Sequence, residues 1–169
     1  MVSKLTGQSL DEMGDLSSKA LKEAGAVGVM LNHAEKKLDL ETLAATIKRA
    51  DELGLATIVC TDTLEEIKAV AAMEPNIIVA EPTALIGTGQ TSDMDYVLDT
   101  IAAVKAINPE IMVLQGAGIS NGSDVYNVIA AGAEATGSTS GIIKAADPAA
   151  MTWEMLTALR NAFDDRNKK

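Results

Sequence analysis

The chain has 169 residues and a formal net charge of −10, and its 47% hydrophobic and 22% charged residues suit one folded domain with a buried core. The acidic balance argues against a nucleic-acid or anionic membrane surface, because both need clustered Lys and Arg. No apolar run approaches the ~18 residues that a spanning helix needs, and the first residues lack the apolar centre of a targeting peptide. We therefore expect no nucleic-acid partner and no membrane.

The single cysteine, Cys60, excludes an internal disulfide and is typical of the reducing cytoplasm. Cytoplasmic localisation is therefore the expectation from the sequence.

Short apolar runs, mostly rich in β-branched residues, alternate with longer amphipathic stretches along the chain. Such runs are typical of strands that are buried on both faces of a parallel sheet. After a helix predicted over residues 9–24, which ends at Gly25, the predicted strands are residues 26–31, 56–60, 76–80, 111–115 and, more weakly, 133–138.

Helices are predicted between these strands from apolar residues spaced three and four apart. One begins after the cap residue Asp39 and ends before Gly54, and the last begins after Asp147 with Pro148 in its first turn. The stripes that would face the core are Leu40, Leu43, Ile47 and Ala50; Val97, Ile101 and Val104; and Met151, Met155, Leu159 and Phe163.

The strict alternation of helices and strands predicts an α/β fold with parallel strands and right-handed crossovers. An open doubly wound sheet and a (β/α) barrel both satisfy this pattern. We expect residues 1–169 to form one domain, with residues 1–8 and 164–169 as mobile ends.

In either architecture ligands bind at the carboxyl ends of the strands, and polar residues stand there. His33 and Glu35 follow the first predicted strand, and Glu81 follows the third. Each also has a plainer interpretation: a lone histidine is often structural, and a carboxylate at a strand end often pairs with a nearby Lys or Arg. No second His or Cys stands at a ligand spacing, so no metal site is predicted.

The segment after Glu81 has the composition of a lid. Pro82 stiffens its start, "TALI" is apolar, and Gly87 and Gly89 give its far end conformational freedom.

The Gly- and Ser-rich turns "GAGISNG" and "STSGIIK" follow the last two strands. Glycine is common in any such turn, but two turns in these positions match the usual phosphate site of barrels.

Four motifs occur in order along the chain: "LNHAE", "EPTALIGTG", "GAGIS" and "SGIIKAADP". With these motifs the chain resembles triosephosphate isomerase, most of all its short archaeal-type branch, over about residues 5–165. The resemblance implies a TIM barrel of (β/α) units, incomplete with about five units. It also implies an isomerase that interconverts dihydroxyacetone phosphate and glyceraldehyde 3-phosphate through an enediolate, with no metal or organic cofactor.

The resemblance also assigns roles. Glu81 would be the base, His33 the neutral electrophile and Glu35 a carboxylate beside the site. Triosephosphate isomerase is itself the standard example of a glutamate base paired with a neutral histidine. The phosphate would be held by Gly87, Gly118, Ser140 and Gly141, and the lid would be Thr83, Ala84, Leu85, Ile86, Gly87, Thr88 and Gly89.

Two departures from the family pattern stand out. Ala34 occupies the place of a serine between the histidine and the glutamate. "KLTGQS" (4–9) resembles the family's loop after the third strand, so we expect the first three strands, and the lysine that the first one carries, to lie outside this sequence. Lys4 is a candidate replacement for that cation.

A partial barrel of five strands would have two open edges. Three solutions remain open from the sequence: an open sheet, edge-to-edge association as a homo-oligomer, or a complementing chain that supplies the missing strands. The alternative to an isomerase is therefore a non-catalytic partial barrel that binds a phosphate compound or a protein chain.

Overall fold

The computed structural model describes residues 2–4, 15–85 and 92–168. Its strands are β1 (Val2–Lys4), β2 (Gly28–Leu31), β3 (Ala56–Thr61), β4 (Ile77–Ala80), β5 (Met112–Gln115) and β6 (Ala135–Thr136). Its helices are α1 (Asp15–Glu23), α2 (Leu40–Glu52), α3 (Leu64–Ala71), the 3₁₀ turn η2 (Thr83–Leu85), α4 (Met94–Ile107), α5 (Gly122–Ala130), α6 (Ser140–Ile143) and α7 (Pro148–Asn167).

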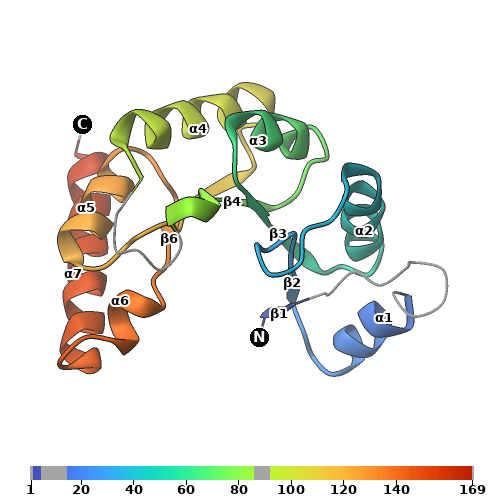
Figure 1. Ribbon diagram of the computed structural model, residues 1–169, viewed down its shortest axis with the longest axis horizontal. Helices are drawn as coiled ribbons and strands as arrows, with labels where there is room; N and C mark the ends of the chain where they lie inside the picture. The colour runs from blue at the N-terminus through green and yellow to red at the C-terminus, as the bar shows by residue number, and fades with distance from the viewer. Residues whose placement is uncertain (1, 5–14, 86–91, 169) are drawn as a thin grey trace.

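The strands form one parallel sheet in the sequential order β1-β2-β3-β4-β5-β6. Helices α2, α3, α4 and α5 follow one another round the outer side of the curved sheet (Figure 1). A doubly wound sheet would reverse its strand order at a switch point, whereas a sequential order is that of a (β/α) barrel. The predicted parallel α/β fold is confirmed, and within the described residues it is an open arc with edges β1 and β6.

β1 is a strand that the sequence analysis did not predict, because three residues with one valine give no apolar run. It pairs with β2 through the register Val2↔Gly28, Ser3↔Val29 and Lys4↔Met30, inside the stretch expected to be a mobile end. At the other end α7 continues to Asn167. Arg166 Nη1 holds this end by donating to the carbonyls of Ile129 and Ala133, at 3.1 and 2.9 Å.

Alternate rows of side chains across the sheet have different surroundings. One row, paired in register, is fully buried against the helices and consists of Leu31, Val59, Ile78 and Val113. The next row is only partly covered, with Met112 42% exposed, and consists of Met30, Ile58, Ile77 and Met112. The expectation that the strands are covered on both faces is therefore wrong for this row. Opposing strands would cover it in a closed barrel.

The predicted helix ends that fall on described residues agree with the structure, whereas the predicted start at residue 9 lies outside the described residues. Asp39 accepts a hydrogen bond from Thr42 N at the start of α2, and Asp147 accepts from Ala149 N and Ala150 N at the start of α7. Gly25 and Gly54 follow α1 and α2 with φ of 89° and 63°, conformations that glycine adopts without strain.

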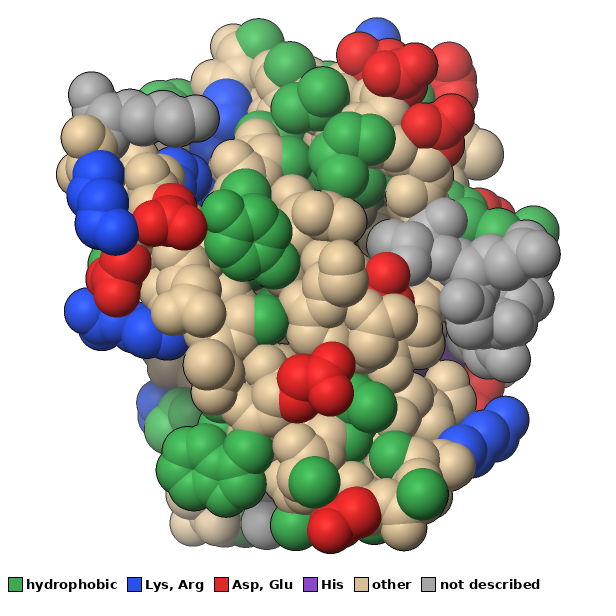
Figure 2. All heavy atoms as spheres, turned by 90° about the vertical axis from the view of Figure 1, so that its left-hand side faces the viewer, with side chains coloured by type: hydrophobic (Ala, Val, Ile, Leu, Met, Phe, Trp, Pro, Cys, Tyr) green, Lys and Arg blue, Asp and Glu red, His purple; other side chains and the backbone are tan. Residues whose placement is uncertain are grey.

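The packing of α7 differs from its predicted stripe. Met155 and Ala162 are buried against α5, whereas Phe163 is 44% exposed. Trp153 and Leu156 are also exposed. Figure 2 shows the side of the molecule that carries α5 and α7, where hydrophobic side chains lie among acidic and basic ones.

Replacing Gly28 tests the close contact between β2 and β3. A Cβ on Gly28 would lie 2.8 Å from the backbone oxygen of Ala56, so Gly28→Ala should destabilise the fold by about 1–3 kcal/mol in urea unfolding. A Cβ on Gly137 meets nothing within 4 Å, so the matched Gly137→Ala should be neutral or stabilise by up to about 1 kcal/mol. Equal effects of the two substitutions would contradict the register of β2 and β3.

Candidate active site

Parallel strands end at one edge of the sheet, and this edge collects the polar residues predicted from the sequence. His33 lies two residues beyond β2, Glu81 follows β4 directly, and Gly118 lies in the loop after β5. Ser140 and Gly141 open α6, which follows β6. The fold therefore places these residues on the same rim, with β3 between the strands that carry His33 and Glu81.

The His33 ring has a defined contact at one nitrogen. Its Nδ1 accepts a hydrogen bond from Glu35 N at 3.4 Å and also lies 3.5 Å from Glu35 Oε2. These contacts compete, because the first needs an unprotonated Nδ1 and the second a protonated one. The Glu35 side chain is 72% exposed, and exposed ion pairs contribute little.

Glu81 is half-buried at the end of β4. Its backbone N donates to Thr61 O at 3.0 Å, which ties it to the end of β3. Its carboxylate lies beside the loop after β5, since a Cβ placed on Gly116 would be 3.5 Å from Glu81 Oε1. The glycine leaves room for the carboxylate at this point of the rim.

The start of the expected lid is ordered. Thr83, Ala84 and Leu85 form η2, in which Leu85 N donates to Pro82 O at 2.9 Å. Thr83 N donates to Asp62 Oδ1 at 2.8 Å. The remaining expected lid positions, Ile86, Gly87, Thr88 and Gly89, lie outside the described residues.

The two turns predicted to hold a phosphate lie against each other. Ser138 Oγ donates to Ile119 O at 2.6 Å, and a Cβ on Gly141 would be 2.7 Å from the same oxygen. Gly118 has a φ of 70°, which favours glycine. The loop with Gly118 and the turn with Ser140 and Gly141 are therefore held together at the rim.

Three further polar residues at this rim had no assigned role in the sequence analysis: Asn32, Asp62 and Glu66. Asn32 is 2% exposed and has a φ of 57°, and its side chain contacts Cys60 and Glu66. The backbone oxygen of Asp62 accepts from Tyr96 Oη at 3.0 Å. Burial, and then the charges of Asp62 and Glu66, raise the pKa of Tyr96 to about 12, so this donor keeps its proton. Asn32 and Asp62 directly follow β2 and β3, and that position was the signal available in the sequence, whereas Glu66 lies in the first turn of α3.

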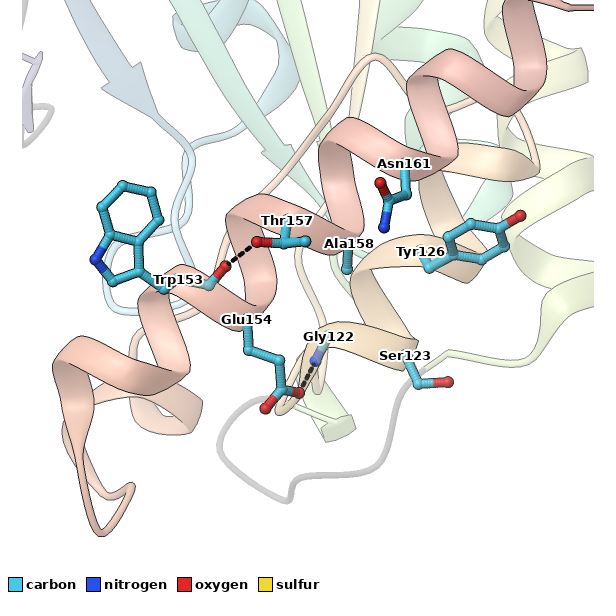
Figure 3. A pocket seen from close by; sticks show the side chains of 8 residues that line it. All are labelled: Gly122, Ser123, Tyr126, Trp153, Glu154, Thr157, Ala158 and Asn161. Carbon is cyan, nitrogen blue, oxygen red and sulfur yellow. Dashed lines mark hydrogen bonds between the residues drawn. The ribbon is translucent and has the colours of Figure 1, made fainter.

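A surface groove lies elsewhere, between α5 and α7 (Figure 3). Tyr126 and Trp153 line it, and Glu154 Oε1 accepts from Gly122 N at 2.7 Å at its base. None of the predicted site residues that the structure describes lines this groove. It is therefore a feature of the helical outside rather than of the rim.

Within the parts of the chain that the structure describes, no three His, Cys, Asp or Glu side chains gather as metal ligands would. None of the described helices combines the length and the hydropathy that a membrane crossing requires.

Comparison of the sequence with known proteins identifies the family of the chain. The family model for triosephosphate isomerase matches residues 13–152. The triosephosphate isomerase of Methanobacterium bryantii is 43% identical over 138 residues, which are 80% of this chain and 61% of that protein. That of Methanosarcina barkeri is 40% identical over 146 residues, which are 85% of this chain and 66% of that protein.

Solved structures share the fold at low sequence identity. The 3-hexulose-6-phosphate synthase of Salmonella typhimurium superposes with a TM-score of 0.65 at 21% identity, over 89% of this chain and 70% of that one. A chain of the Amycolatopsis orientalis BexX/CysO complex gives a TM-score of 0.72 at 13% identity, over 99% of this chain and 68% of that one. These likenesses concern the fold alone.

The sequential parallel sheet with a carboxylate and an imidazole on its carboxyl edge defines a protein of the (β/α)-barrel class. Within that class, the chain belongs to the triosephosphate isomerase family. It spans about three fifths to two thirds of the length of the curated relatives described above.

Ser138→Ala tests the contact between the two turns. The substitution removes the donor to Ile119 O and leaves a partly buried carbonyl without it, so the free energy of unfolding should fall by about 1 kcal/mol. Ser123 is exposed on α5, and Ser123→Ala should stay within about 0.5 kcal/mol of the parent. Urea unfolding of both variants measures the difference, and an unchanged Ser138→Ala would contradict the contact.

Proposed function

We propose that this chain carries the isomerase site of its family and acts on a small phosphorylated triose, interconverting dihydroxyacetone phosphate and glyceraldehyde 3-phosphate. The observation that carries the proposal is the shared rim: Glu81 and His33 follow β4 and β2, on either side of β3. The bond from Glu35 N to His33 Nδ1 supports a neutral imidazole with Nε2–H as its donor.

In the proposed reaction the Glu81 carboxylate takes a proton from the carbon next to the substrate carbonyl. The electron pair of the broken C–H bond forms the enediolate, whose charge collects on the former carbonyl oxygen. His33 Nε2–H donates to that oxygen and stabilises it. Glu81 then returns its proton to the neighbouring carbon while the hydroxyl proton passes between the two oxygens. This shuttle is balanced without a cofactor.

The phosphate would lie where the two turns meet. Backbone N–H groups around Gly118, Ser140 and Gly141 are the proposed donors, with Gly87 as a further one carried over from the family. Thr83, Ala84 and Leu85 would begin the lid. Glu35 would act beside the site by holding the His33 ring through its backbone.

A cation near the phosphate is the part of the family site with the least support in this chain. Lys4 is the last residue of β1 and is paired in register with Met30, so its backbone stands at the same edge. We propose it as the replacement cation. Ala34 lacks the hydroxyl that the family places between its histidine and glutamate.

The open edges β1 and β6 of the described sheet favour a second candidate. The half-covered row Met30, Ile58, Ile77 and Met112 would be buried by a second copy of the chain or by a complementing chain. In that case this chain alone would bind a phosphate compound without turning it over. Because the chain has a single cysteine, which is typical of proteins of the reducing cytoplasm, we propose the cytoplasm as the location of either function.

Glu81→Gln separates the two candidates. If Glu81 is the base, its loss should lower kcat by at least about a hundredfold, in a coupled assay with glyceraldehyde 3-phosphate and with the mass measured by light scattering. Glu110 is an exposed residue before β5, and Glu110→Gln should keep full activity. No turnover in the parent chain, together with binding of dihydroxyacetone phosphate in calorimetry, would contradict the isomerase and support the binding protein.

A further inference from the structure

The loops that carry His33 and Glu81 are linked by a chain of polar contacts across β3. Its members are Asn32, Glu66, Asp62 and Thr83, which come from the loop after β2, from α3, from the loop after β3 and from the segment after β4. Every contact in it joins described residues. Because two acidic side chains carry it, their geometry decides how the two loops sit relative to each other.

The Glu66 carboxylate has partners in the loop after β2 and in the loop after β3. Its Oε1 accepts from Asn32 Nδ2 at 2.8 Å, and its Oε2 accepts from Asp62 N at 2.7 Å. Lys37 Nζ lies 3.5 Å from both oxygens. The Glu66 side chain is 22% exposed, so these bonds are partly shielded from water.

Capping of α3 accounts for only part of this arrangement. Thr63 is the N-cap and accepts from Glu66 N, and the spacing T-x-x-E is that of a capping box. A capping box needs one carboxylate oxygen, which would bond to the N-cap N–H. Here Oε2 reaches one residue further, to Asp62 N, and Oε1 crosses to the next loop.

The Asn32 side chain connects the Glu66 carboxylate to the backbone next to His33. Its Nδ2 donates to both Cys60 O and Glu66 Oε1, and its Oδ1 accepts from Leu38 N at 2.9 Å. Both amide hydrogens are therefore in use, and the side chain has no freedom to turn. The backbone is left-handed at Asn32, and His33 is the next residue.

Asp62 makes the corresponding contact on the side of Glu81. Its Oδ1 accepts from Thr83 N at 2.8 Å, two residues beyond Glu81. Its backbone oxygen accepts from Tyr96 Oη on α4. Asp62 thus contacts both the start of the segment after β4, at Thr83, and the first turn of α4, at Tyr96.

We propose that Glu66 and Asp62 are positioning residues that set His33 and Glu81 in register with each other through Asn32 and Thr83. The inference rests on the proposed function for its catalytic consequence, but the coupling of the two loops is a property of the fold itself. Catalytic rates fall steeply when reacting groups are misplaced by an ångström, so the coupling should affect kcat more than KM.

The single histidine allows a direct test that does not need activity. In the full chain labelled with ¹⁵N, the imidazole resonances report His33 alone, and hydrogen exchange of the Thr83 amide reports the segment after Glu81. We expect Glu66→Ala to speed exchange at Thr83, which it does not contact, and Asp62→Ala to shift the His33 resonances. Asp147→Ala removes a helix cap at the far end of the sheet and should change neither.

The kinetic arm uses the same variants at a temperature where all are folded. We expect Asp62→Ala and Glu66→Ala to lower kcat by ten- to a hundredfold with KM within about threefold. Asp62→Asn keeps an oxygen acceptor for Thr83 N and should recover most of kcat, as a merely structural loss would not. It also keeps the test decisive if the alanine variants do not fold.

The outcomes separate this inference from the proposed function. Unchanged Thr83 exchange in Glu66→Ala, together with unchanged His33 resonances in Asp62→Ala, would show that the loops are held independently and would overturn the inference. Coupled loops in a parent chain without turnover would uphold the positioning role in the fold and overturn the isomerase.

Discussion

The structure depends on one constraint, the continuous row Leu31, Val59, Ile78 and Val113 that runs across four parallel strands. All four side chains are removed from water against the helices, and a slip of one residue in any strand would turn its set to the other face. Register is therefore fixed from β2 to β5. Because the strands are parallel and sequential, the same register fixes where each strand ends, and so places the polar rim.

The register of the buried side chains fixes where the strands end, but it does not fix the conformation of the loops that follow. Hydrogen bonds between polar groups fix those loops. The bonds from Asn32 to Glu66, from Thr83 to Asp62 and from Ser138 to Ile119 each join segments that follow adjacent strands. Partly buried bonds of this kind are costly to leave unmade. The fold thus brings Glu81, His33 and the turn with Ser140 and Gly141 to one rim, while the row Met30, Ile58, Ile77 and Met112 on one face of the sheet remains only partly covered.

Much of this fold follows from local signals. The caps Asp39 and Asp147 and the β-branched strands are encoded within a few residues, so the sequence predicts them. β1 was not predicted, because its three residues carry no local strand signal and are defined as a strand by their pairing with β2. Phe163 has the spacing of a buried residue, but the tight contact of α5 with α7 favours Ala162 there. The proposed roles of Glu81 and His33 come from motifs in the sequence. The contacts of Glu66 with Asn32 and Asp62 depend on tertiary geometry, and from the sequence Glu66 reads only as part of a capping box.

If Glu81 is the proposed base, it removes a carbon-bound proton from a triose phosphate, and exchange of that proton with solvent reports this single step. Dihydroxyacetone phosphate incubated with the chain in D₂O would be followed by proton NMR. We expect deuterium incorporation at the hydroxymethyl carbon with the parent chain and none above the buffer level with Glu81→Gln, even where the overall isomerisation is slow. Equal, buffer-level incorporation with both proteins would contradict it.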